Sequence, residues 1–113
     1  MEDILANGKY AVLFHQGKGA DHFDLLLEGQ SLCPTFQFDN KELDSGLRIQ
    51  DHRKKYLAFE GLISKEKGIV SIVELGTYLF SKNLLVLVSA KYSHTLSLNK
   101  ERNIIKKNGA SLN

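Results

Sequence analysis

The chain has 113 residues, of which 42% are apolar, so it can bury one modest core and is expected to form a single domain over residues 1–113. Fifteen Lys and Arg residues against 13 Asp and Glu residues give a net charge of only +2, which excludes a strongly basic nucleic-acid binder. Any basic surface must therefore be local. The single cysteine, Cys33, excludes an intramolecular disulfide framework and a cysteine-based zinc cluster.

The composition also bears on location. The N-terminal sequence MEDILANGK lacks the basic segment and the long apolar run of a signal peptide. No stretch approaches the roughly 18 apolar residues of a membrane span. We therefore expect a cytoplasmic protein without membrane contact, and a single cysteine fits such a reducing compartment.

Two strands are predicted first in chain order. The segment KYAVLFH is rich in β-branched and aromatic side chains, which favour a strand. The glycine-containing loop QGKGAD then returns the chain to HFDLLLE. In a strand, successive side chains point to opposite faces, so His22 and Asp24 are expected to share one face.

A third strand, LCPTFQF, contains the only proline, which indicates an edge strand or a bend. The following segment, DNKELDSG, predicts a loop with one helical turn, capped by Asp39 or Asn40 and closed by Gly46.

The second half of the chain is more plainly β. Short apolar runs alternate with turn residues and predict the strands LRIQDH, YLAFEG, GIVSIVELGTYLF, NLLVLVSA and YSHTLSL. Because LLVLV is apolar on both faces, we expect cover on both sides, which favours a small closed or strongly curled antiparallel barrel. The predicted fold class is all-β with one or two short helical turns. Residues 99–113 are ambiguous between a last strand, a helical turn and a basic tail.

His15, His22 and Asp24 form a first candidate site. His15 ends one predicted strand and the other two begin the next, so a hairpin-like return brings them together. Two imidazoles and a carboxylate suit a divalent transition metal such as manganese, iron or zinc. On spacing alone, polar side chains that merely face water remain the stronger alternative.

A second polar group lies in QDHRKKYLAFEG. His52 and Tyr56 flank three cations, Arg53, Lys54 and Lys55, so this segment could neutralise and orient a phosphate. The alternative is a solvated basic turn in which the tyrosine ring caps the core.

Two further residues are given ordinary roles. His94 lies in an isolated polar stretch and is interpreted as a surface residue. Cys33, beside Pro34, is interpreted as a small half-buried side chain.

The order of the two polar groups resembles the phosphoesterase domain of bacterial DNA ligase D and, more closely, its stand-alone single-domain relatives. The resemblance covers about residues 9–98. Its most specific part is the joint appearance of a His-aromatic-Asp strand, an Asp-His pair four residues before a tyrosine, and Phe-Glu-Gly shortly after. It implies a small β-barrel with short flanking helices, and manganese-dependent removal of 3′ ribonucleotides and 3′ phosphates from primer ends.

The resemblance also implies roles for single residues. His15, His22 and Asp24 match the metal ligands, and His52 and Tyr56 match phosphate-contacting and catalytic positions. The implied cofactor is Mn²⁺, with other divalent transition metals left open. The implied partners are nucleic-acid 3′ ends and DNA-repair proteins, and the oligomeric state stays open.

One position departs from the active relatives, which carry an arginine two residues after the metal-binding aspartate. This chain has Leu26 there, and leucine cannot donate to a phosphate. Arg48 or Arg53 could supply the missing charge as a phosphate-binding residue, because Arg48 is expected to share a strand face with His52. The alternative function is a catalytically silent or weakened module of the same fold that binds nucleic-acid ends or a partner protein.

Overall fold

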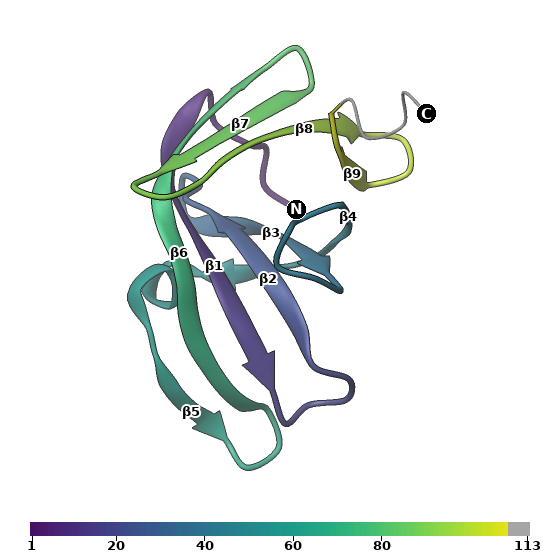
Figure 1. Ribbon diagram of the computed structural model, residues 1–113. Coiled ribbons are helices and arrows are strands. Elements are labelled where there is room, and N and C mark those ends of the chain that lie inside the picture. The colour runs from purple at the N-terminus through teal and green to yellow at the C-terminus, as the bar shows by residue number, and fades with distance from the viewer. Residues whose placement is uncertain (109–113) are drawn as a thin grey trace.

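A computed structural model describes residues 1–108, and over this range the chain folds into strands with one short 3₁₀ helix (Figure 1). The elements are β1 (Asn7–Gln16), β2 (His22–Leu27), β3 (Leu32–Phe38), β4 (Ser45–Arg53), η1 (Lys54–Ala58), β5 (Gly61–Ser64), β6 (Gly68–Ser81), β7 (Leu84–Ser89), β8 (Ser93–Asn99) and β9 (Ile104–Lys107).

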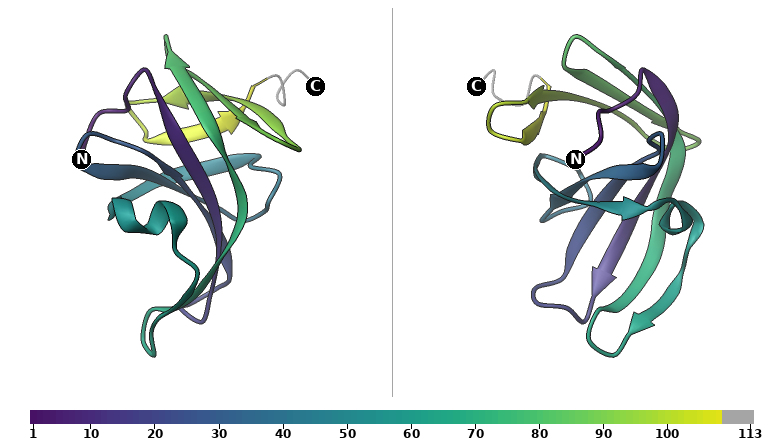
Figure 2. Two further views of the ribbon diagram at one scale, coloured as in Figure 1. Left: turned by 90° about the vertical axis from the view of Figure 1, so that its left-hand side faces the viewer. Right: turned by 180° about the vertical axis from the view of Figure 1, so that it is seen from behind.

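Eight of these strands close into an antiparallel barrel in the order β1-β2-β3-β4-β9-β8-β7-β6, because β6 pairs back onto β1. The remaining strand, β5, pairs only with the N-terminal part of β6. Figure 2 shows the long strands β1 and β6 side by side along the barrel wall. The predicted all-β antiparallel barrel is confirmed.

The barrel interior is filled mainly by side chains from one face of β1, β2, β3, β6, β7, β8 and β9. Side chains alternate across a strand, so Tyr10 and Val12 of β1 point inward together with Leu25 and Leu27 of β2. Complete burial of such a side chain contributes about 1.5–3 kcal/mol. The inner cluster consists of Tyr10, Val12, Leu25, Leu27, Phe36, Phe38, Leu43, Tyr78, Leu85, Leu87, Leu96 and Ile105.

The outer face of β1 and β2 is buried as well, whereas antiparallel strands commonly have one face in the core and the other in water. A second, outer cluster contains Ala11, Leu13, Leu26, Cys33 and Val70. Tyr56 and Leu57 of η1 pack against it together with Phe59, Ile63 and Ile72. Strands β1 and β2 are therefore covered on both sides, and Leu13, Tyr56 and Val70 of the outer cover lie next to the polar residues His15 and Asp24.

The helical turn lies elsewhere than expected. Residues 39–44 form bends and a turn, in which Leu43 adopts a left-handed backbone (φ 57°) that lets its side chain enter the inner cluster. The only helix among residues 1–108 is η1, within the segment YLAFEG and the residues before it, for which a strand was predicted. That prediction is wrong because Tyr56, Leu57 and Phe59 cover the outer cluster, at a spacing an extended strand does not offer.

Two strand predictions also need correction. Of the two alternatives for the proline-containing strand, the edge strand is wrong, since β3 pairs with both β2 and β4. The bend agrees with the register shift at Pro34, between Cys33 and Thr35, where the missing N–H is tolerated. β7 is not covered on both faces, because Leu84 and Val88 point outward and are exposed.

The ambiguous C-terminal segment contributes a strand, β9, which joins β4 to β8 and so completes the barrel. Residues 109–113 of that segment lie outside the described residues. Over residues 1–108, no helix has the length and hydrophobicity needed to cross a membrane.

Candidate metal centre

The pairing of β1 with β2 brings the three predicted metal ligands together. His15 lies directly opposite His22, and Leu13 lies opposite Asp24, so all three polar side chains project from the outer face of the barrel. The connecting loop uses Gly17 and Gly19 at positive φ, a conformation that glycine adopts without steric cost. One potential ligand atom from each of the three residues lies within 4.8 Å of the others.

The carboxylate of Asp24 is at the centre of this group. Its Oδ2 is 3.5 Å from Nδ1 of His15, and its Oδ1 is 3.4 Å from Nε2 of His22. Asp24 is only 2% exposed, and its Oδ1 is buried without a hydrogen-bond partner. An unsatisfied buried carboxylate oxygen is costly, and a bound cation is a direct way to satisfy it.

The backbone orients both imidazoles toward the carboxylate. Nε2 of His15 lies 2.5 Å from the carbonyl oxygen of Lys67, and Nδ1 of His22 lies 2.9 Å from that of Ala20. A carbonyl only accepts, so these two nitrogens carry the protons and donate. The other ring nitrogen of each histidine lies on the side of Asp24, and in the neutral imidazole it carries the lone pair with which histidine binds a metal. The residues present therefore fit a divalent transition metal with three protein ligands.

A cavity of about 450 Å³ opens beside this group. It is lined by His15 and Asp24 and by the predicted phosphate-site residues His52, Arg53 and Tyr56. The structure thus brings both polar groups of the sequence, far apart in the chain, to one place.

His52 and Tyr56 face this cavity in a fixed arrangement. Nδ1 of His52 donates to the carbonyl oxygen of Gln50 at 2.9 Å, which leaves Nε2 as the acceptor nitrogen. The ring of Tyr56 stands nearly perpendicular to that of His52, with centroids 6.2 Å apart, and also packs edge-on against Phe59.

Arg48 is not brought to the cavity, and the expectation that it shares a strand face with His52 is wrong. Arg48 lies opposite Phe36 of the inner cluster, whereas His52 lies opposite Cys33 of the outer cluster. The register shift beside Pro34 reverses the alternation between them. The Arg48 guanidinium donates instead to Oδ1 of Asp51 (2.8 Å) and to the carbonyl oxygen of Glu2 (2.7 Å).

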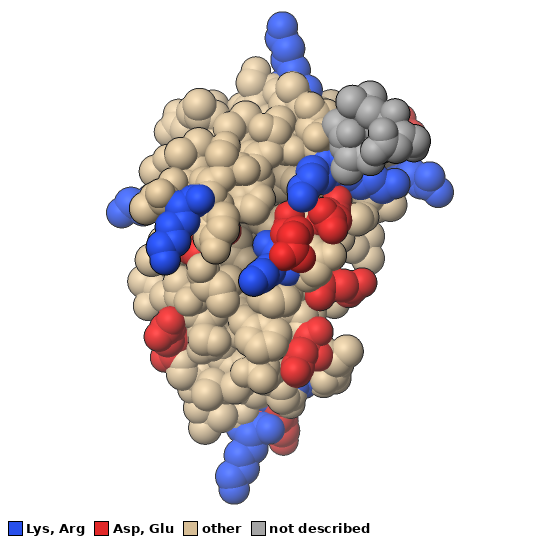
Figure 3. All heavy atoms as spheres, viewed as in Figure 1, with Lys and Arg blue, Asp and Glu red and all other residues tan. Residues whose placement is uncertain are grey.

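Two cations that the sequence did not single out, Lys18 and Lys67, also line the cavity. Lys18 belongs to the loop between the two metal-site histidines, and Lys67 precedes β6 and also provides the carbonyl that holds His15. The position of Lys18 in the sequence, between His15 and His22, could have indicated that it lies near the candidate metal centre. On the face seen in Figure 3, acidic and basic side chains are interspersed, so positive charge there is not gathered in one broad patch.

Leu26 lies on the same strand face as Asp24, as predicted, but it is fully buried in the outer cluster. Tyr56 and Leu57 pack against this cluster. Leu26 therefore stabilises the packing of η1 against the barrel wall and offers no hydrogen-bond donor to the cavity.

No model of a known protein family matches this chain, and no curated protein matches it either. The barrel and its group of possible metal ligands therefore rest on the residues and distances given above.

Proposed function

We propose that the protein is a metal-dependent phosphoesterase that acts on 3′ phosphate or 3′ ribonucleotide ends of nucleic acid, like the phosphoesterase domain of DNA ligase D that its sequence resembles. One observation carries the proposal. Asp24, whose Oδ1 is unsatisfied, and His15 line one cavity with a second histidine, a tyrosine and three cations, and His22 completes the group of possible metal ligands beside it.

His15, His22 and Asp24 would hold the metal. Imidazole and carboxylate ligands suit manganese, iron and zinc, and the resemblance favours Mn²⁺. A divalent ion in this position supplies Lewis-acid chemistry toward a phosphoryl oxygen.

The remaining cavity residues would bind the phosphate and move a proton. Arg53 offers a planar pair of donors to two phosphate oxygens, while Lys18 and Lys67 act as point charges. Together they would replace the arginine that is absent at position 26. Nε2 of His52 is free to accept a proton, since its other ring nitrogen is bonded to Gln50.

The direct test loads the purified protein with Mn²⁺ and supplies a primer–template with a 3′ phosphate or one 3′ ribonucleotide. We expect release of inorganic phosphate or of the nucleoside, and loss of this activity in Asp24→Ala and His22→Ala. The matched control is His94→Gln, which changes another buried histidine that pairs with a carboxylate outside this cavity. No processing by the wild type, or equal rates in Asp24→Ala, would contradict the proposal.

The burial of Leu26 favours a second candidate, a module of the same fold that binds 3′ ends without processing them. The two candidates differ in what the wild-type protein does to a bound 3′-phosphate end. Metal-dependent binding without processing, together with processing by a folded Leu26→Arg variant, would support the binder. Nucleic-acid ends are the proposed partner in both cases, with DNA-repair proteins and a cytoplasmic location as part of the same proposal.

A further inference from the structure

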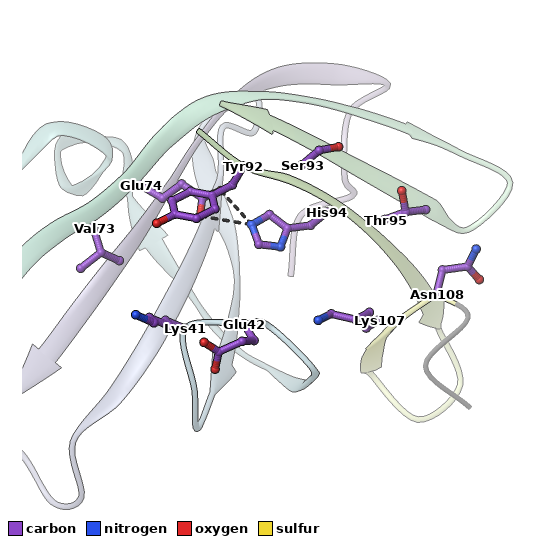
Figure 4. Close-up of a pocket in the computed structure, with 10 residues that line it drawn as sticks. All are labelled: Lys41, Glu42, Val73, Glu74, Tyr92, Ser93, His94, Thr95, Lys107 and Asn108. Carbon is purple, nitrogen blue, oxygen red and sulfur yellow. Dashed lines mark hydrogen bonds and ion pairs between the residues drawn. The ribbon is translucent and has the colours of Figure 1, made fainter. Parts of the chain in front are cut away.

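A second, larger cavity of about 700 Å³ lies on the other side of the barrel wall (Figure 4). Among its lining residues, Glu74 of β6 is paired with Val12 of the inner cluster, and His94 of β8 is paired with Leu87 of the same cluster. Both side chains therefore project toward the barrel interior, whereas the candidate metal centre projects outward.

The carboxylate of Glu74 is fully engaged. The hydroxyl of Tyr10 donates to its Oε2, and Nε2 of His94 lies 3.0 and 3.1 Å from its two oxygens. Burial, together with the neighbouring carboxylate of Glu74, raises the pKa of Tyr10 well above its usual value, so this hydroxyl remains a donor. Both oxygens of Glu74 thus have partners within the protein itself.

His94 has one ring nitrogen left over. Nε2 is engaged with Glu74, and in the neutral imidazole Nδ1 is then an acceptor; Nδ1 has no hydrogen-bond partner within residues 1–108. The side chain is only 10% exposed. Figure 4 shows this nitrogen on the side of the ring away from Glu74, without a dashed line to any residue drawn. This atom can accept a hydrogen bond from an N–H or O–H group of a bound molecule.

The other side chains that line the cavity indicate which shape and charge a bound molecule would need. Tyr92 is 51% exposed and lies beside the ring of His94, with centroids 6.2 Å apart, and Val73 is 45% exposed. These two side chains offer an apolar wall to a flat ring. At the rim, Lys107 is already paired with Asp44, while Lys41 has no ion pair in the described part of the chain and can meet an anion.

We propose that this cavity binds a small aromatic acid. The ring lies on Tyr92 and Val73, its N–H or O–H donates to Nδ1 of His94, and its carboxylate lies near Lys41. A volume of about 700 Å³ is within the usual range for small-molecule sites. The site is independent of the proposed phosphoesterase function, since it uses the opposite face of the wall.

The test uses indole-3-acetate, which carries a ring N–H and a carboxylate. We expect a dissociation constant at or below about 1 mM, together with a shift of the ¹⁵N resonance of His94 Nδ1 in histidine-labelled protein. Two matched compounds separate the contacts: 1-methylindole-3-acetate lacks the donor and indole-3-acetamide lacks the charge. Each should bind roughly tenfold more weakly.

Substitutions of exposed residues at the rim of the cavity are not expected to disturb folding, so they test binding alone. Tyr92→Leu and Lys41→Gln alter exposed side chains and should weaken binding, whereas Glu42→Gln removes a repelling charge and should strengthen it. Asp24→Ala should bind the probe as the wild type does, so failure of the metal site and failure of this site can be told apart. Unchanged affinity for the N-methylated compound, or no shift of His94 Nδ1 well above about 1 mM probe, would overturn the proposal.

Discussion

Two histidine–carboxylate groups lie on opposite faces of the same barrel wall, and they differ in how the carboxylate is satisfied. At the outer face, Oδ1 of Asp24 is buried without a partner, although two imidazoles lie within 3.5 Å of the carboxylate. At the inner face, Tyr10 and His94 engage the carboxylate of Glu74. Residue types alone therefore do not distinguish a metal site from a structural network.

The direction of each imidazole explains the difference. His15 and His22 donate to backbone carbonyls through one ring nitrogen and direct the other toward Asp24, an arrangement that could hold a cation. Nε2 of His94 is engaged with Glu74, and its Nδ1 lies on the side of the ring away from Glu74. The outer carboxylate thus has an oxygen that a metal ion could satisfy, whereas the carboxylate of the inner group already has its hydrogen-bond partners.

The largest expected effect on folding comes from Glu74→Ala. It would leave the Tyr10 hydroxyl and the His94 N–H without their acceptor, and each buried group left unsatisfied in this way costs about 1–3 kcal/mol. We expect that loss in the free energy of unfolding, measured by urea denaturation, with the affinity of the folded variant for Mn²⁺ unchanged. A stability within about 1 kcal/mol of the wild type would show that the inner network is not structural.

Asp24→Ala should give the reverse pattern. Changes next to a metal ligand commonly reduce affinity 10–100-fold, so loss of the ligand itself should reduce Mn²⁺ affinity by at least about 100-fold in calorimetric titration. The metal-free variant should be as stable as the wild type or more so, because the group removed is an unsatisfied buried carboxylate. A large loss of stability without metal would instead make the outer group structural.

Two buried tyrosines provide a finer comparison. Tyr10 and Tyr78 are each 1% exposed, but Tyr10 donates to the Glu74 carboxylate and Tyr78 donates to the neutral carbonyl of Glu28 at 2.7 Å. Hydrogen bonds to charged groups contribute about 1.5–3 kcal/mol and neutral ones about 0.5–1.5 kcal/mol. Tyr10→Phe should therefore lower the free energy of unfolding more than Tyr78→Phe does. Equal losses would mean that Glu74 is not charged in the folded protein.

Strand alternation made the outer group predictable from the sequence. His22 and Asp24 share a face because the pleat has a period of two, and a short glycine-containing loop places His15 opposite them. The all-β class was also predictable from the succession of short apolar runs. Closure into a barrel was correct, but it was argued from cover on both faces of β7, and that strand is exposed on one face.

The positions of Arg48 and His94 and the burial of Leu26 depend on long-range packing and on a register shift, which the alternation of side chains along a strand does not predict. The register shift at Pro34 separates Arg48 from His52, and such a shift of one residue moves a side chain to the opposite face. His94 was interpreted as a surface residue because its partner, Glu74, belongs to a different strand 20 positions away. Leu26 was correctly placed beside Asp24, but its burial depends on the packing of η1 against the outer cluster.

Asp51 provides the test with the smallest expected effect. It lines the outer cavity, but both oxygens of its carboxylate have hydrogen-bond partners within the protein, as those of Glu74 do. It accepts hydrogen bonds from Arg48 and from the backbone N–H of Glu2, each at 2.8 Å. Burial alone would raise the pKa of this carboxyl, but these bonds and the charge of Arg48 lower it below the ordinary 3.8. A satisfied carboxylate should not contribute to metal binding, so Asp51→Asn should leave Mn²⁺ affinity within a few-fold of the wild type.

The same substitution should affect stability in a pH-dependent way. A carboxyl with a lowered pKa in the folded state stabilises the protein above its unfolded pKa, and this stabilisation is lost as the pH falls through the folded value. We expect Asp51→Asn to cost about 1 kcal/mol near pH 7, and the difference from the wild type to shrink as the pH falls below 3.8. Urea denaturation of both proteins across the acidic range measures this difference. A difference that stays constant down to low pH would mean that the lost contact is steric, and that Asp51 is not held as an anion by Arg48.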